Sequence, residues 1–94
     1  MDNSIKRIHI YISGEVTGVG FRSWTLHNAR KLGLTGWVRN TADGKVEAVF
    51  EGVKDRLCNM IKKCKKGPEV SFVESVDEQW QEAKGEFQTF EIRS

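Results

Sequence analysis

A change from strand to helix is encoded at residues 14–22, which read Gly14-Glu15-Val16-Thr17-Gly18-Val19-Gly20-Phe21-Arg22. A β-like run from Ile5 to Ser13 precedes this stretch, and a helix-like run from Ser23 to Leu32 follows it. Glycine reaches left-handed backbone angles at low cost, so successive N–H groups can converge on one anion beside a helix N-terminus. Arg22 adds a planar, permanently charged group that suits phosphate oxygens. The stretch therefore predicts a small phosphate cradle.

The hydrophobic pattern on either side of the cradle predicts further strands and helices. Ile8, Ile10 and Ile12 alternate with polar residues, which is typical of a half-buried strand. A second helix carries an apolar stripe at helical spacing, and Gly67-Pro68 ends it because proline resists continuing a helix. The expected strands are 5–13, 35–40, 45–51, 70–80 and 87–92, and the expected helices are 23–32 and 54–65.

The order of these elements predicts the fold. Thr41-Ala42-Asp43-Gly44 lies between two strands, and Asp-Gly favours the tight turn of an antiparallel hairpin. The order β-α-β-β-α-β with an extra terminal strand indicates an α+β fold of the ferredoxin-like, or split-βαβ, type. Such a fold has both helices on one face of a mainly antiparallel sheet. Its first crossover returns the second strand near the first, so the glycine-rich loop and the hairpin can be neighbours.

The composition indicates one ordinary soluble domain. Ninety-four residues suffice for one modest core, and we expect residues 1–94 to form a single domain. A net charge of +2 is too small to indicate nucleic-acid binding on its own. No apolar run reaches the roughly 20 residues of a membrane span, and Met1–Ser4 lack the features of a signal peptide. We therefore expect a cytoplasmic protein with neither a membrane nor a nucleic-acid partner.

The cysteines and histidines carry weaker functional signals. Cys58 and Cys64 lie six residues apart on a predicted helix, a spacing that suits neither a disulfide nor a zinc site. We expect Cys64 to fill the core and Cys58 to be partly exposed. His9 and His27 are expected to be surface or packing residues rather than acid–base catalysts.

A cluster of lysines closes the second helix. Cations are favourable at a helix C-terminus and solvate its exposed face, so a structural role is expected for the cluster rather than nucleic-acid or membrane binding. Its members are Lys62, Lys63, Lys65 and Lys66.

The known nucleotide-binding motifs are not satisfied. In the dinucleotide fingerprint G-x-G-x-x-G, the third glycine after Gly18 and Gly20 is replaced by Ser23. A Walker A loop also fails, because Val19 stands where its second glycine is required. RNA binding would require exposed aromatic residues in an RNP-like run, which the sequence lacks.

A second motif covers residues 36–47, Gly36-Trp37-Val38-Arg39-Asn40-Thr41-Ala42-Asp43-Gly44-Lys45-Val46-Glu47. Together with the glycine-rich loop it resembles the acylphosphatases, small enzymes that hydrolyse the carboxyl-phosphate bond of acyl phosphates. The resemblance covers nearly the whole chain, including Gly67-Pro68 and the ending Phe90-Glu91-Ile92. It implies a ferredoxin-like fold and hydrolysis without a metal or an organic cofactor.

The resemblance also assigns roles to individual residues. Arg22 matches the arginine that binds the substrate phosphate, and Asn40 matches the asparagine that holds the attacking water. Thr17 departs from the family, where glutamine is usual; since the cradle acts through backbone amides, we expect an effect on packing or specificity more than on chemistry. The residues whose backbone matches the phosphate cradle are Val16, Thr17, Gly18, Val19, Gly20 and Phe21.

A non-catalytic anion-binding module is the main alternative. Asn40 favours the enzyme, because a phosphate receptor needs no group that positions water. Acylphosphatase-like domains also occur inside larger proteins such as hydrogenase maturation factors. The short chain and its strand pattern lead us to expect instead a free-standing, monomeric enzyme acting on a small-molecule acyl phosphate.

Overall fold

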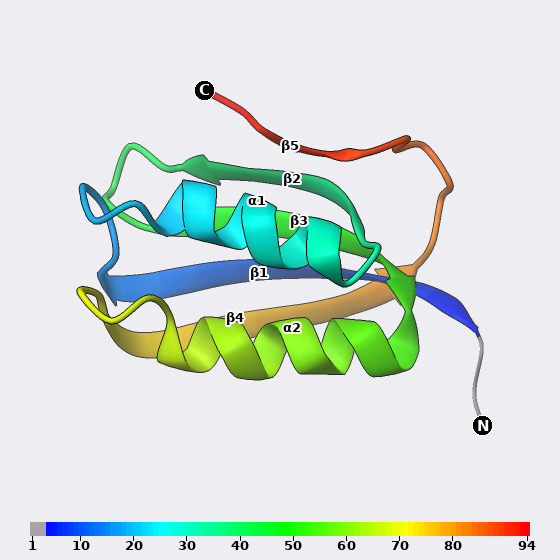
Figure 1. The fold of residues 1–94 in the computed structure, drawn as a ribbon, viewed down its shortest axis with the longest axis horizontal. Helices are drawn as coiled ribbons and strands as arrows, with labels where there is room; N and C mark the ends of the chain where they lie inside the picture. The colour runs from blue at the N-terminus through cyan, green and yellow to red at the C-terminus, as the bar shows by residue number, and fades with distance from the viewer. Residues whose placement is uncertain (1–3) are drawn as a thin grey trace.

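Two helices pack side by side on one face of a five-stranded sheet (Figure 1). The computed structural model describes residues 4–94; Met1–Asn3, which belong to the segment where the sequence predicts no targeting signal, lie outside the described residues. The elements are β1 (Ile5–Glu15), α1 (Phe21–Lys31), β2 (Thr35–Asn40), β3 (Val46–Val53), α2 (Lys54–Lys66), β4 (Phe72–Glu82) and β5 (Phe90–Ile92).

The strand order in the sheet is β4-β1-β3-β2-β5. All neighbouring pairs are antiparallel except β2 and β5, which run parallel. This arrangement confirms the ferredoxin-like α+β fold with an added terminal strand. The cradle loop and the β2–β3 loop lie at the same end of the sheet (Figure 1), as the crossover rule predicts.

The core lies between the helices and the inner face of the sheet. The alternating isoleucines of β1, Ile8, Ile10 and Ile12, are fully buried there. The predicted stripe of α2 is buried as well, and it consists of Leu57, Met60, Ile61 and Cys64. Burial raises the pKa of the Cys64 thiol to about 12, so it behaves as an apolar filler, whereas Cys58 is exposed. Both cysteine predictions are confirmed.

Two strand predictions near the C-terminus need correction. The chain turns after α2 through a hydrogen bond from Ser71 N–H to the Pro68 carbonyl, 2.9 Å long, so β4 begins at Phe72 rather than at residue 70. The last strand is limited to residues 90–92. Phe87, which the sequence placed in this strand, instead packs beneath the Arg7 guanidinium, 4.9 Å from its ring centre.

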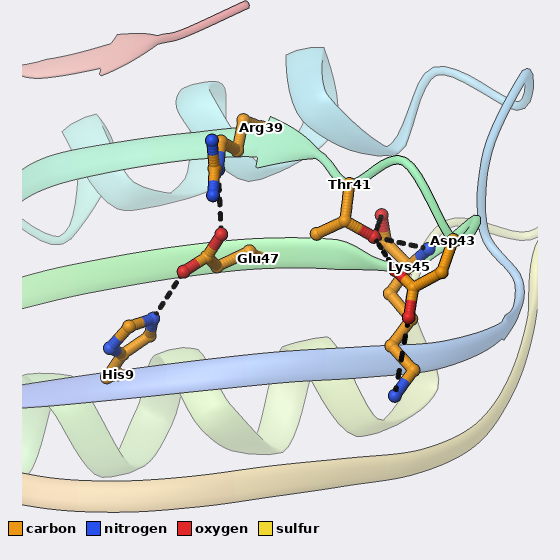
Figure 2. Close-up of polar contacts among 6 residues, drawn as sticks. All are labelled: His9, Arg39, Thr41, Asp43, Lys45 and Glu47. Atoms are coloured by element: carbon orange, nitrogen blue, oxygen red, sulfur yellow. Dashed lines mark hydrogen bonds and ion pairs between the residues drawn. The ribbon is translucent and has the colours of Figure 1, made fainter.

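The β2–β3 connection is longer than the predicted tight turn. Asn40 pairs with Val46, which leaves five residues in the loop. Thr41 closes it: its N–H donates to the Lys45 carbonyl over 2.9 Å, and its hydroxyl accepts from Lys45 N–H over 3.0 Å. The same hydroxyl donates to the Asp43 carboxylate (Figure 2), and this bond lowers the pKa of Asp43. The side chain of Thr41 therefore fixes a loop that Asp-Gly alone does not close.

The outer face of the sheet, opposite the helices, contains carboxylates that are almost fully buried. Glu47 accepts from Arg39 Nε and lies 2.7 Å from His9 Nε2, so it joins β1, β2 and β3 (Figure 2). Burial alone would raise the pKa of Glu47, but hydrogen bonds from Arg39, His9 and Tyr11 outweigh it and lower the pKa. His9 is thus a structural partner, as the sequence predicts.

Glu51 secures the connection between β4 and β5. Its carboxylate accepts hydrogen bonds from Lys84 N–H at 3.0 Å and from Gly85 N–H at 3.1 Å, and it accepts a third from Arg7 Nε at 2.8 Å. Arg7 also contacts Glu86. Burial opposes ionisation of Glu51, but these donors prevail and lower its pKa. The long segment from β4 to β5 is therefore anchored to the sheet by Glu51 together with its partner Arg7.

Acid should destabilise this fold through Glu47 and Glu51. The folded pKa values of both carboxyl groups are lowered, so the unfolded chain binds protons more readily than the folded chain. The stabilisation is therefore complete at pH values above the unfolded pKa of about 4.3, and it is lost as the pH falls through the folded pKa values. The free energy of unfolding of Glu51→Gln should be about 3 kcal/mol lower at pH 7, and it should decrease less steeply than that of the wild type as the pH falls. Urea denaturation from pH 7 to 3 measures both effects, with exposed Glu69→Gln as the control. An unchanged acid dependence in Glu51→Gln would contradict the assignment.

Candidate active site

The cradle loop holds left-handed backbone at two glycines. Gly18 and Gly20 have φ angles of 71° and 77°, a region that L-residues with side chains avoid. A Cβ added at either position would meet no atom within 4 Å, so the backbone angle, not crowding, requires glycine. Among residues 4–94, the N–H groups of residues 17–20 donate no hydrogen bond to the protein. They are therefore free to bind an anion.

The N-terminus of α1 adds further free donors. Gly20 occupies the N-cap position and has no side chain to cap the helix. The first helical hydrogen bond runs from Trp24 N–H to the Gly20 carbonyl over 3.0 Å, so the N–H groups of Phe21, Arg22 and Ser23 have no acceptor within the helix. No acidic side chain lies in the first turn. The positive end of the helix dipole is thus left open toward the loop.

Buried apolar side chains lie beneath this first turn and support it. Val16 and Phe21 are each 1% exposed, and the Phe21 ring meets the edge of Trp24 at a centroid distance of 5.3 Å. Thr25 Oγ1 donates to the Phe21 carbonyl over 2.8 Å. The loop therefore rests on side chains locked in the core, which fixes the direction of its amides.

Arg22 and Asn40 face this region with unused polar groups. Arg22 is exposed, and within residues 4–94 its guanidinium forms no ion pair or hydrogen bond. Asn40 ends β2, and its Oδ1 is buried without a hydrogen-bond partner in the described chain. An unpaired buried acceptor costs free energy, so Asn40 Oδ1 is suited to accept a hydrogen bond from a bound molecule.

One cavity of about 190 Å³ brings the two motifs together. Six of the eight predicted site residues line it; Thr17, which is exposed, and Val19, which packs against the core, do not. Two lining residues were not predicted, Ser23 and Ile92. Ile92 follows Phe90 by two positions in β5, so the period of a strand would have placed it on the helix side. The lining residues are Val16, Gly18, Gly20, Phe21, Arg22, Ser23, Asn40 and Ile92.

Three larger hollows lie elsewhere in the described part of the chain and contain none of the predicted site residues; the smallest of them, of about 260 Å³, borders Phe87 and Arg93. One, of about 590 Å³, borders Trp80 at the end of β4, and another, of about 420 Å³, borders Trp37 on the outer face. The smaller cavity is the better candidate, because it combines free amides, an unpaired guanidinium and an unpaired amide oxygen. In the described part of the chain, no three His, Cys, Asp or Glu side chains are grouped to hold a metal ion.

The family model for acylphosphatase matches residues 8–92. This chain belongs to the acylphosphatase family. The acylphosphatase of Syntrophobacter fumaroxidans is 48% identical over 87 residues, covering 93% of this chain and 90% of the relative. That of Nostoc sp. is 47% identical over 87 residues, covering 93% of this chain and 85% of the relative.

Solved acylphosphatase structures share the whole fold. The crystal structure of acylphosphatase from Bacillus subtilis superimposes with a TM-score of 0.91 at 31% identity, covering 95% of this chain and 99% of that one. Full-length HypF in its phosphate- and nucleotide-bound form has a TM-score of 0.86 at 26% identity; all of this chain is covered, but only 12% of HypF. An acylphosphatase-like unit thus also occurs within a much longer protein.

Proposed function

We propose that this protein hydrolyses acyl phosphates to a carboxylate and inorganic phosphate by direct attack of water. The observation that carries the proposal is the single cavity in which the free amides of the cradle, Arg22 and Asn40 meet. A phosphoryl group bound there would receive hydrogen bonds from the amides and from the guanidinium. These donors neutralise charge on the equatorial phosphoryl oxygens, which is the main requirement of phosphoryl transfer.

Asn40 is proposed to orient the water. Its Oδ1 accepts one hydrogen bond from the water, which directs the oxygen lone pair at phosphorus. The water oxygen bonds to phosphorus as the bond from phosphorus to the acyl oxygen breaks, and that electron pair leaves on the carboxylate. The water proton passes to a phosphate oxygen of the substrate. Because a carboxylate is a good leaving group, the step requires no protein acid.

The proposed mechanism, which uses the cradle amides, Arg22 and Asn40, requires neither a metal ion nor a titrating base. No histidine lines the cavity; His27 is exposed on α1 and His9 contacts Glu47 on the outer face. We predict that benzoyl phosphate hydrolysis is unaffected by EDTA and varies little between pH 6 and 8. Hydrolysis that EDTA abolishes, or a steep bell with a histidine-like pKa, would contradict this mechanism. Tight phosphate binding without turnover would instead identify an anion-binding module.

We further propose that residues 1–94 act as one monomeric domain in the cytoplasm, with an acyl phosphate as the small-molecule substrate. The residues that line the cavity come from both ends of the sequence, from Val16 to Ile92, which supports a single domain. The two free cysteines are compatible with a reducing compartment. No helix within residues 4–94 has the length and apolar character needed to cross a membrane.

A further inference from the structure

The helix layer is strongly basic. Helices α1 and α2 contain nine of the fifteen Lys and Arg residues but only one of the thirteen Asp and Glu residues. Both helices lie on the same face of the sheet (Figure 1). A chain with a net charge of only +2 therefore presents one markedly positive face, the face to which the cradle belongs.

The two helices run antiparallel, and two contacts fix their alignment. Arg56 Nη1 of α2 donates to the Leu32 carbonyl at the end of α1 over 3.1 Å. At the other end, a Cβ added to Gly67 would stand 2.8 Å from Phe21 Cε2. The number of residues from Arg56 to Gly67 equals the number from Phe21 to Leu32. The two helices therefore rise by the same distance between these contacts.

This alignment brings two lysines of α2 level with the first turns of α1, outside the lining of the cavity itself. Lys66 lies level with Arg22, because each is one residue inside the Gly67–Phe21 contact. Lys63 follows Arg56 by two helical turns and so lies on the same side of α2, the side facing α1. Both lysines are exposed, and within residues 4–94 neither forms an ion pair.

The other two lysines of the cluster are directed differently. Lys65 pairs with Glu78 of β4 over 3.2 Å, so its side of α2 faces the sheet edge away from α1. Lys62 lies about 120° around the helix axis from Arg56, the residue that reaches α1, and is therefore turned from α1 as well. Lys63 and Lys66 are the members of the cluster closest to the cradle.

The direction of the leaving group points to the same side. In an in-line displacement the acyl oxygen leaves opposite the attacking water. The water site is at Asn40, on the β2 side of α1, whereas α2 ends on the side of α1 away from β2 (Figure 1). Resting on the proposed function, we propose that Lys63 and Lys66 bind an anionic group on the acyl moiety. The preferred substrates are then acyl phosphates that carry a second negative group, a carboxylate or a phosphate.

A matched pair of substrates tests this subsite. Benzoyl phosphate and 4-carboxybenzoyl phosphate differ by one carboxylate, and kcat and KM for each can be measured at 0.15 M ionic strength, where charges interact over about 8 Å. The test variant is Lys63→Gln/Lys66→Gln. The control is Lys54→Gln/Lys62→Gln, which removes the same charge from the same helix at positions away from the cradle.

We expect the test variant to lose roughly fivefold in the preference for 4-carboxybenzoyl phosphate, through KM, since two exposed ion pairs are lost. Its hydrolysis of benzoyl phosphate should remain within about twofold of wild type, and the control should keep the preference. An unchanged preference in the test variant, or an equal loss in both variants, would overturn the subsite. Failure of the wild type on both substrates would instead refute the proposed function.

Discussion

Replacing Arg22 with alanine should lower kcat/KM for benzoyl phosphate by roughly 10³-fold or more, the scale seen when an arginine no longer stabilises a transferring phosphoryl group. The guanidinium borders the cavity and makes no ion pair within residues 4–94, so its charge is available to substrate. Arg22→Lys should recover part of the loss, because it restores the charge but not the bidentate fork. Lys31→Ala, in the last turn of the same helix, should leave the rate near wild type.

The stability of Arg22→Ala separates this role from a structural one. A cation in the first turn of a helix opposes the helix dipole, so removing it should leave the free energy of unfolding unchanged or raise it by about 0.3–1 kcal/mol. Urea denaturation of both proteins measures the difference. Near-normal activity, or a loss of activity explained by unfolding, would argue against a catalytic Arg22.

Replacing Asn40 with alanine should lower kcat by about 10²- to 10³-fold, the effect of removing one well-placed polar group in a transition state. Inhibition by inorganic phosphate should change little, because the cradle amides and Arg22 remain. The fold should tolerate the change, since Asn40 Oδ1 has no partner to lose in the described chain. Asn59→Ala, on the exposed face of α2, is the matched control. A kcat within a few-fold of wild type would remove Asn40 from the mechanism.

The core between the helices and the sheet could be predicted from the local hydrophobic pattern. The isoleucines of β1 and the stripe of α2 each follow one period, and burial follows from that period alone. The backbone geometry of the cradle loop could also be predicted from the sequence, because left-handed glycines and a helix N-terminus depend on local residues. The roles of Arg22 and Asn40 were predicted from the resemblance to the acylphosphatases, and their proximity depends on the crossover that brings β2 beside the cradle.

Burial on the outer face of the sheet depends on residues that are far apart in sequence. Glu51 falls on the polar face of its strand, yet it is buried because Arg7 and the amides of Lys84 and Gly85 surround it. No local pattern indicates that a segment more than thirty residues away covers it. The shortness of β5 has a similar origin: its parallel pairing with β2 extends over three residues, too few for a periodic signal.

The attachment of β5 also determines where the protein can be modified for laboratory use. The N–H of Arg93 donates to the Val38 carbonyl over 2.8 Å, and the preceding Ile92 forms part of the cavity wall. Residues fused after Ser94 would therefore emerge beside the substrate. The carbonyl of Ser4 accepts a hydrogen bond from Lys54 N–H over 3.2 Å at the start of α2, and α2 starts at the end of the sheet opposite the cradle loop (Figure 1), so an affinity tag or a surface-immobilisation linker belongs at the N-terminus. Kinetic constants from C-terminally tagged material would include interference by the tag.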